Sequence, residues 1–139
     1  MNEADRVLLQ HKELTHKIIG VFNEVYDELG HGFLESVYQR SLTIALRASG
    51  LEARAEVKIP VWFRGERVGQ FEGDLLVNNS ILLELKVAQC LNFSHQAQLL
   101  NYLRATNIEI GLLLNFGIKP EFRMLTFENT RKTIRAKGS

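Results

Sequence analysis

The sequence predicts an α/β (α+β) fold in which helices flank a mixed sheet of four to five strands. Two helical periodicities occupy the first fifty residues, and two apolar runs separated by a short polar turn form a hairpin. A helical stretch then joins the second run to another apolar run, and crossovers of this kind connect parallel strands. The hairpin is antiparallel, so the sheet is mixed. The expected order is helix, helix, three strands, helix, strand and an optional last strand, or ααβββαβ(β).

The bulk composition predicts one domain over residues 1–139, with a core at about 14–127 and a basic C-terminal tail at 128–139. The apolar fraction of 45% and the charged fraction of 24% are ordinary for a globular protein. No apolar run is long enough to span a membrane, and the N-terminus has no secretory signal pattern. We therefore expect a cytoplasmic protein without a membrane partner.

The first helix is expected from about Asp5 to Leu29, because its apolar positions recur at spacings of three and four. Gly30 supplies a C-terminal stop, and a second helical pattern runs from near Leu34 to Gly50. The apolar positions of the first helix are Leu14, Ile18, Phe22, Val25 and Leu29.

The strands follow from runs of β-branched and aromatic residues. Pro60, in the first run, indicates an edge strand or a bulge, and the segment RGERVG reverses the chain. The unbroken apolar run IGLLLNF is typical of a strand covered on both faces. The expected strands are 55–63, 70–77, 81–87, 110–116 and an outer 122–127, with a helix at 94–106.

Charge is unevenly placed along a chain whose net charge is only +1. Residues 1–30 hold three basic and six acidic residues, whereas the segment from Lys119 onward holds six basic and two acidic residues. The basic tail could hold phosphates, although a solvated chain end explains it equally well. Cys90 is the only cysteine, which excludes an internal disulfide, and we expect a buried, inert thiol.

The hairpin carries the residues with chemical potential, which are Asp74, Glu84 and Lys86. Glu84 and Lys86 are two apart on one strand and so face the same side. If Val77 opposes Ile81 across a three-residue turn, Asp74 lies opposite Glu84 and the leucines share the other face. A two-residue turn would instead mix charge into the core, so the hydrophobic pattern favours the first register.

Two neighbouring carboxylates in a half-buried site repel each other unless a cation joins them. Oxygen ligands of this kind select Mg²⁺ or Mn²⁺. Lys86 could orient or deprotonate a water held by the metal, or neutralise charge on a phosphate. From spacing alone, a surface salt-bridge ladder of Asp74, Glu84 and Lys86 is the commoner explanation. The apolar surroundings in ILLELKV favour a functional site, because charges there are costly unless paired.

The following helix presents His95, Gln98 and Tyr102 on one face. Gln98 could orient the attacking water, and Tyr102 and His95 are candidates for contacting a phosphate or base, although a polar face turned to solvent is an equal alternative. Glu35 falls in the first turn of the second helix, where a carboxylate stabilises the helix end without any further role.

Five segments in order, GFLESVY, GDLLV, ILLELKV, HQAQLLNYL and GLLLNFG, resemble the GxxExxY family, a branch of the PD-(D/E)xK nuclease superfamily with a restriction-endonuclease-like core. The resemblance covers about residues 14–125. It implies that Asp74, Glu84 and the Leu85 backbone carbonyl hold the metal, that Lys86 is the active-site lysine, and that Glu35 adds to the metal site. It also implies that Gln98 and Tyr102 match the QxxxY element of RecB-type and Cas4-like nucleases, while Gly73 stands where the superfamily motif has proline.

Two function classes follow from these observations. The first is a Mg²⁺- or Mn²⁺-dependent nuclease acting on DNA rather than RNA through Asp74, Glu84, Lys86 and Gln98. The second is a non-catalytic module that binds nucleic acid or protein on the same fold, an alternative suggested by the weak net charge. Because so short a chain offers limited surface, a homodimer or a partner protein could complete a nucleic-acid groove.

Overall fold

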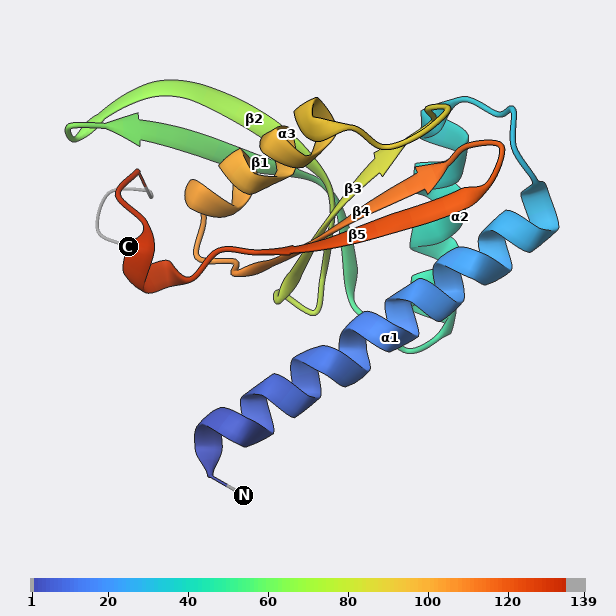
Figure 1. Ribbon diagram of the computed structural model, residues 1–139, viewed down its shortest axis with the longest axis horizontal. Coiled ribbons are helices and arrows are strands. Elements are labelled where there is room, and N and C mark those ends of the chain that lie inside the picture. The colour runs from blue at the N-terminus through green and yellow to red at the C-terminus, as the bar shows by residue number, and fades with distance from the viewer. Residues whose placement is uncertain (1, 135–139) are drawn as a thin grey trace.

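The computed structural model describes residues 2–134, which form three helices, five strands and a short 3₁₀ helix (Figure 1). Every expected helix and strand is present in the expected order. The helices are α1 (Glu3–Leu29), α2 (Glu35–Ala48) and α3 (Phe93–Arg104), and the 3₁₀ helix is η1 (Asn129–Arg131). The strands are β1 (Ala53–Phe63), β2 (Glu66–Val77), β3 (Ile81–Lys86), β4 (Ile110–Phe116) and β5 (Pro120–Thr126).

The five strands form one mixed sheet in the order β1-β2-β3-β4-β5. The β3–β4 pair, joined by α3, is parallel, and the other pairs are antiparallel, as the crossover and hairpin patterns predicted. In the central hairpin Val77 pairs with Ile81 and Leu75 with Leu83, which confirms the three-residue turn. Asn78 and Asn79 adopt the positive φ angles of 50° and 54° that this turn requires.

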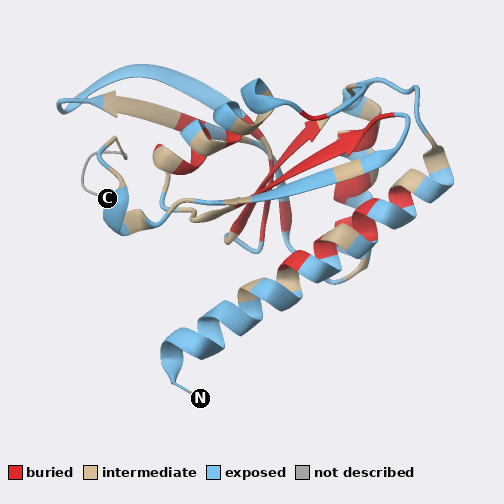
Figure 2. Ribbon diagram, in the orientation of Figure 1, coloured by how far each residue is buried: buried red, intermediate tan, exposed pale blue. Residues whose placement is uncertain are grey.

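Helices cover both faces of the sheet, and each face has its own apolar core (Figure 2). The first core lies between α1, α2 and one face, and it contains the hairpin leucines that were predicted to share a face. The second lies beneath α3 on the opposite face. Strand β4 is buried along nearly its whole length, as its unbroken apolar run predicted.

The β1–β2 hairpin extends as an arm beyond the helices (Figure 1). β1 is an edge strand, and its register with β2 shifts at Val61 and Trp62, directly after Pro60. The prediction of an edge strand or bulge at Pro60 is thus confirmed. The turn is tighter than the expected segment RGERVG, because Arg64 and Gly65 alone take positive φ angles and β2 resumes at once.

The expectation for Cys90 is wrong, because its thiol is exposed in the loop between β3 and α3. The described part of the basic tail also packs against the body: Lys132 Nζ donates to the carbonyl oxygens of Thr106 (2.9 Å) and Ile108 (2.6 Å). Residues 135–139 of the tail lie outside the described residues. Among residues 2–134, no helix combines the length and apolar composition that a membrane span needs.

Candidate active site

The connection between α1 and α2 sets the position of Glu35. Gly32 has a φ of 109°, a conformation that side chains disfavour. The buried Tyr38 hydroxyl donates to Gly30 O (2.5 Å) and accepts from Phe33 N–H (3.3 Å), so it ties the connection to the helix that follows. Glu35 is thereby placed at the first position of α2, near Asp74 on β2. The spacing of Gly32, Glu35 and Tyr38 thus has a direct structural explanation.

Asp74 and Glu84 lie where the β2–β3 ladder opens. Regular backbone pairing between β2 and β3 ends at Leu75 and Leu83. Beyond this pair, the two carboxyl groups accept the hydrogen bonds from backbone N–H groups of the two strands. The Asp74 N–H donates to Glu84 Oε1 (3.0 Å), and the Leu85 N–H donates to Asp74 Oδ2 (2.8 Å). Each carboxyl group is therefore held by the other strand, and the sequence-based expectation that Asp74 lies beside Glu84 is confirmed.

A second irregularity frees the Asp74 backbone from β1. The β1–β2 register omits the Glu56–Asp74 pair, and Glu56 has a φ of 58°. The Asp74 carbonyl instead accepts a hydrogen bond from Gln39 Nε2 (2.9 Å) on α2. Sequence reasoning missed Gln39; the available signal was its position four residues after Glu35, which puts both side chains on one face of α2.

Lys86 continues the site toward α3. Its Nζ donates to Gln98 Oε1 (2.8 Å), and Gln98 Nε2 in turn donates to the Tyr102 hydroxyl (3.1 Å). The Tyr102 ring packs against Phe71 of the β1–β2 arm, with 5.2 Å between ring centroids. The structure therefore brings together Lys86, Gln98 and Tyr102 from segments that the sequence separates, and Phe71 joins them although no sequence pattern marked it.

The carboxyl groups are electrostatically strained as a pair. Glu84 is only 4% exposed, and burial together with the Asp74 charge raises its pKa to about 8. Burial also raises the pKa of Asp74, against the lowering effects of the Leu85 N–H and the Lys86 charge. The pKa of Glu35 is raised by burial first and by the nearby Asp74 charge second. Near neutral pH the pair retains a proton on Glu84.

This donor set fits a divalent cation. A hydrated Mg²⁺ needs one or two protein carboxylates beside water and phosphate oxygens, and a cation would relieve the repulsion that raises both pKa values. Each carboxyl group is oriented by a backbone N–H, and the Asp74 and Glu84 side chains are the groups that would hold the ion. Among residues 2–134 no group of three His, Cys, Asp or Glu side chains is close enough to bind a metal. Glu35 is thus near the pair without completing a three-carboxylate cluster.

His95 lies at the start of α3. Its Nδ1 accepts from the Asn92 N–H (3.2 Å), while the Asn92 side chain accepts from the His95 N–H (3.1 Å), which forms a capping box. This capping explains His95 without a substrate, and its contact with substrate stays a prediction.

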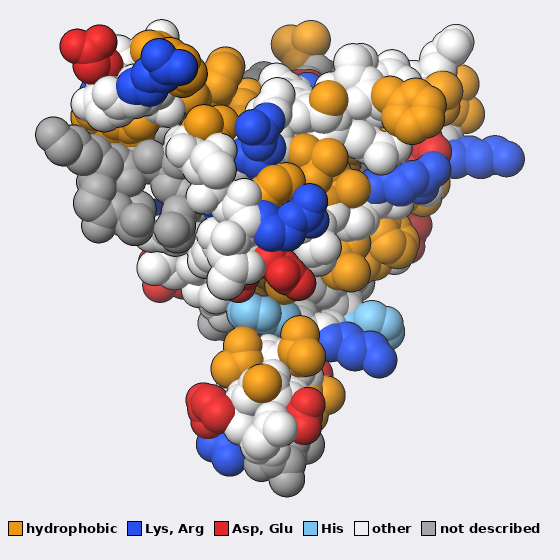
Figure 3. All heavy atoms as spheres, turned by 60° about the vertical axis from the view of Figure 1, so that its left-hand side comes forward, with side chains coloured by type: hydrophobic (Ala, Val, Ile, Leu, Met, Phe, Trp, Pro, Cys, Tyr) orange, Lys and Arg blue, Asp and Glu red, His pale blue; other side chains and the backbone are white. Residues whose placement is uncertain are grey.

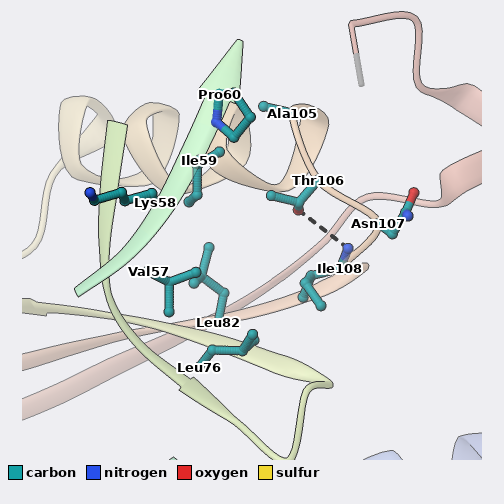
Figure 4. Close-up of a pocket in the computed structure, with 10 residues that line it drawn as sticks. All are labelled: Val57, Lys58, Ile59, Pro60, Leu76, Leu82, Ala105, Thr106, Asn107 and Ile108. Atoms are coloured by element: carbon teal, nitrogen blue, oxygen red, sulfur yellow. Dashed lines mark hydrogen bonds between the residues drawn. The ribbon is translucent and has the colours of Figure 1, made fainter. Parts of the chain in front are cut away.

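A small cavity of about 170 Å³ lies between β1 and the loop after α3, and neither Asp74 nor Glu84 is among its lining residues (Figure 4). Val57, Ile59, Leu76 and Leu82 line much of it, and within the loop that forms one wall the Ile108 N–H donates to Thr106 Oγ1 (3.2 Å). Its apolar lining indicates incomplete packing, and we assign it no chemistry.

Comparison with known proteins places this geometry in a family. A solved protein, described as "Crystal structure of SSO0001", has a similar fold with a TM-score of 0.55 and 21% sequence identity. The match covers 67% of this chain and 50% of the other, so this chain spans half the length of that relative. No curated protein matches. The family model described as "PD-(D/E)XK nuclease superfamily" matches residues 12–125, and with the α+β, restriction-endonuclease-like architecture this establishes that the chain belongs to that superfamily.

Proposed function

We propose that this protein hydrolyses phosphodiester bonds of nucleic acid, DNA rather than RNA, with Mg²⁺ or Mn²⁺ held by Asp74 and Glu84. The observation that carries the proposal is the interlocked carboxyl pair. Asp74 and Glu84 are each fixed by a backbone N–H of the neighbouring strand, with Lys86 on the same face of the sheet. Holding two carboxyl groups side by side in a buried site lowers the stability of the fold unless a bound cation compensates their charges.

Asp74 and Glu84 would supply the charged ligands and the Leu85 carbonyl a neutral one. The bound ion would polarise the phosphate and lower the pKa of the attacking water. Two carboxylates beside a phosphodiester leave room for the phosphate oxygens in the coordination sphere. The Asp74 charge raises the pKa of Glu35, so the Glu35 side chain lies near the Asp74–Glu84 pair. Glu35 would hold a water molecule there or approach the ion by a change of rotamer.

Lys86 would place its ammonium group beside the scissile phosphate. Gln98 Oε1 accepts a hydrogen bond from Lys86 Nζ, which fixes the direction of the ammonium group. The remaining ammonium protons can compensate the negative charge that grows on the phosphate as the water oxygen bonds to phosphorus and the ester oxygen leaves. The hydrogen bond from Gln98 Nε2 to the Tyr102 hydroxyl fixes Tyr102 at the border of the site. From this position Tyr102 would contact a phosphate or base of the substrate. His95 would make a similar contact from the start of α3.

The arm formed by β1 and β2 supports a nucleic-acid substrate despite the net charge of +1. It borders the site through Phe71, which packs on Tyr102. Lys58, Arg64 and Arg67 are exposed along this arm, interspersed with the exposed Glu66 and Glu72, and exposed cations attract phosphates.

We place the chain within the GxxExxY branch of the superfamily. The α1–α2 connection supports this, because the glycine, glutamate and tyrosine of the motif act together. Gly32 allows the turn, the Tyr38 hydroxyl fastens it, and Glu35 lies near enough to Asp74 for the Asp74 charge to raise its pKa.

The test is cleavage of end-labelled single- and double-stranded DNA and RNA with Mg²⁺, Mn²⁺ or EDTA. Wild type should cleave DNA only with the ions, and Asp74→Asn should abolish cleavage, because asparagine can still accept from Leu85 N–H but carries no charge. Glu66→Gln removes an exposed carboxylate at the start of β2, far from the pair, and should cleave as wild type does. Cleavage that persists in EDTA or in Asp74→Asn would contradict the proposal. Salt-sensitive DNA binding without cleavage would favour the alternative, a non-catalytic binding module.

A further inference from the structure

On the sheet face that α1 covers, the edge strand β5 has exposed apolar side chains. Phe122 and Met124 of β5 pair with Leu114 and Leu112, whose side chains belong to the core beneath α1 and α2. Directly paired residues point to the same face, so Phe122 and Met124 face this side of the sheet as well. They are nevertheless 44% and 53% exposed. The edge of this core is therefore unfinished within one copy of the chain.

A groove of about 740 Å³ runs between β5 and α1 along this edge. Its lining is mostly apolar, with Ile19 on α1 opposite Phe122 and Met124. Lys12, His11 and His16 also line it, and the described residues that form its walls include no Asp or Glu. The groove is thus apolar at its floor and basic along its helical rim.

The N-terminal end of α1, residues 3–13, projects beyond the body of the molecule (Figures 1 and 3). This segment carries Val7, Leu8 and Leu9, all exposed, with Leu8 67% exposed. Hydrophobic side chains cover part of the projecting end in the space-filling view (Figure 3). Glu3 and Asp5 begin the segment; Glu3 pairs with Arg6 of the same helix (3.5 Å), which leaves Asp5 as the acidic residue available to a partner. An isolated helix end of this kind gains little from packing on its own chain, and a partner would stabilise it.

We propose that the groove binds residues 3–13 of a second copy of this chain, in a two-fold symmetric dimer with antiparallel α1 helices. The groove and the segment are complementary in two respects. Leu8, which lines the end of the groove nearest the N-terminus, would pack against Leu8 and Leu9 of the second copy and extend the apolar surface, and Asp5 would lie opposite Lys12 of the second copy, because positions 5 and 12 face each other when an antiparallel pair is centred between residues 8 and 9. Because both copies carry groove and segment, two-fold symmetry satisfies both exchanges at once.

The dimer leaves both candidate active sites accessible. The groove lies on the α1 face of the sheet, whereas Lys86 bonds to α3 on the opposite face. The inference therefore stands independently of the nuclease proposal, and failure of one would not be failure of the other.

Sedimentation equilibrium of the full chain tests the dimer. At about 100 µM, the wild type should have about twice the monomer mass of 15.9 kDa. Leu8→Glu places a charge in the apolar contact and should raise the dissociation constant about tenfold or more, equivalent to ~1.4 kcal/mol. Ile44→Glu alters an equally exposed apolar residue on α2, outside the groove, and should leave the dimer intact. Thermal unfolding of each variant checks that the fold is retained.

A charge exchange tests the orientation. Asp5→Lys and Lys12→Glu should each weaken the dimer, and the two substitutions together should restore part of the lost affinity, because the opposite charges then meet again. The proposal would be overturned if the wild-type protein had the mass of a monomer at this concentration. It would also be overturned if Leu8→Glu left the dissociation constant of the dimer unchanged. Equal weakening by Ile44→Glu would also overturn it, and additive weakening in the double charge variant would overturn the antiparallel arrangement.

Discussion

The Glu84→Gln variant should be more stable than the wild type without metal at alkaline pH. Glu84 is 4% exposed and its pKa is raised from 4.5 to about 8, by burial first and by the Asp74 charge second. Glutamine keeps an oxygen that can accept from the Asp74 N–H but never ionises. The substitution thus removes the cost of a buried charge and preserves the hydrogen bond.

The sign follows from proton linkage. Folded Glu84 holds its proton between about pH 4.5 and 8, whereas unfolded Glu84 has lost it. Wild-type stability therefore falls as pH rises through this window, by ~1.4 kcal/mol per pH unit for one group. Relative to Glu84→Gln, the accumulated loss above pH 8 is on the order of 3–5 kcal/mol. Asp74, whose pKa is also raised, shifts in the same direction.

Urea unfolding from pH 5 to 9 in EDTA measures the effect. The difference in unfolding free energy between variant and wild type should grow with pH and level off above pH 8. Adding Mn²⁺ at pH 8 should restore wild-type stability and leave Glu84→Gln much less affected, since the variant lacks one charged ligand. A pH-independent difference between the two proteins would refute the reasoning, because Glu84 would then titrate normally in the folded state.

Other predictions follow from local packing and from the support of the site. Gly117→Ala should destabilise the fold by ~2 kcal/mol or more, because the added Cβ would lie 2.3 Å from the Ala88 carbonyl oxygen; thermal unfolding checks this against Gly69→Ala, which has open space and should be neutral. Gln39→Leu removes the donor to the Asp74 carbonyl and should cost ~1 kcal/mol of stability. The same variant should weaken Mn²⁺ binding about tenfold in a calorimetric titration, and unchanged binding would show that Gln39 does not position Asp74.

The sequence predicted the elements well because its periodicities were strong and its turn residues unambiguous. The register of the central hairpin followed from keeping Leu75 and Leu83 on one apolar face, and the structure confirms it. Helical spacing predicted that Gln98 and Tyr102 share a face of α3, whereas the hydrogen bond from Lys86 to Gln98 became visible only in the structure. Local patterns therefore sufficed to predict that Asp74 and Glu84 would meet.

The parts that sequence patterns could not predict depend on contacts between distant segments. The omitted Glu56–Asp74 pair and the bond from Gln39 are consequences of how α2 meets the sheet. Cys90 was expected to be buried from its residue type, but the loop after β3 leaves it exposed. The short hairpin turn likewise depended on Arg64 taking a positive φ, which its residue type disfavours.

The central claim is that Asp74 and Glu84 share a divalent cation, and a calorimetric titration with Mn²⁺ at pH 7 tests it most directly. Because the pKa of Glu84 is about 8, binding should release close to one proton per chain, seen as a dependence of the heat on buffer ionisation enthalpy. Asp74→Asn should abolish binding. Mn²⁺ binding that releases no proton, or that persists unchanged in Asp74→Asn, would contradict the claim.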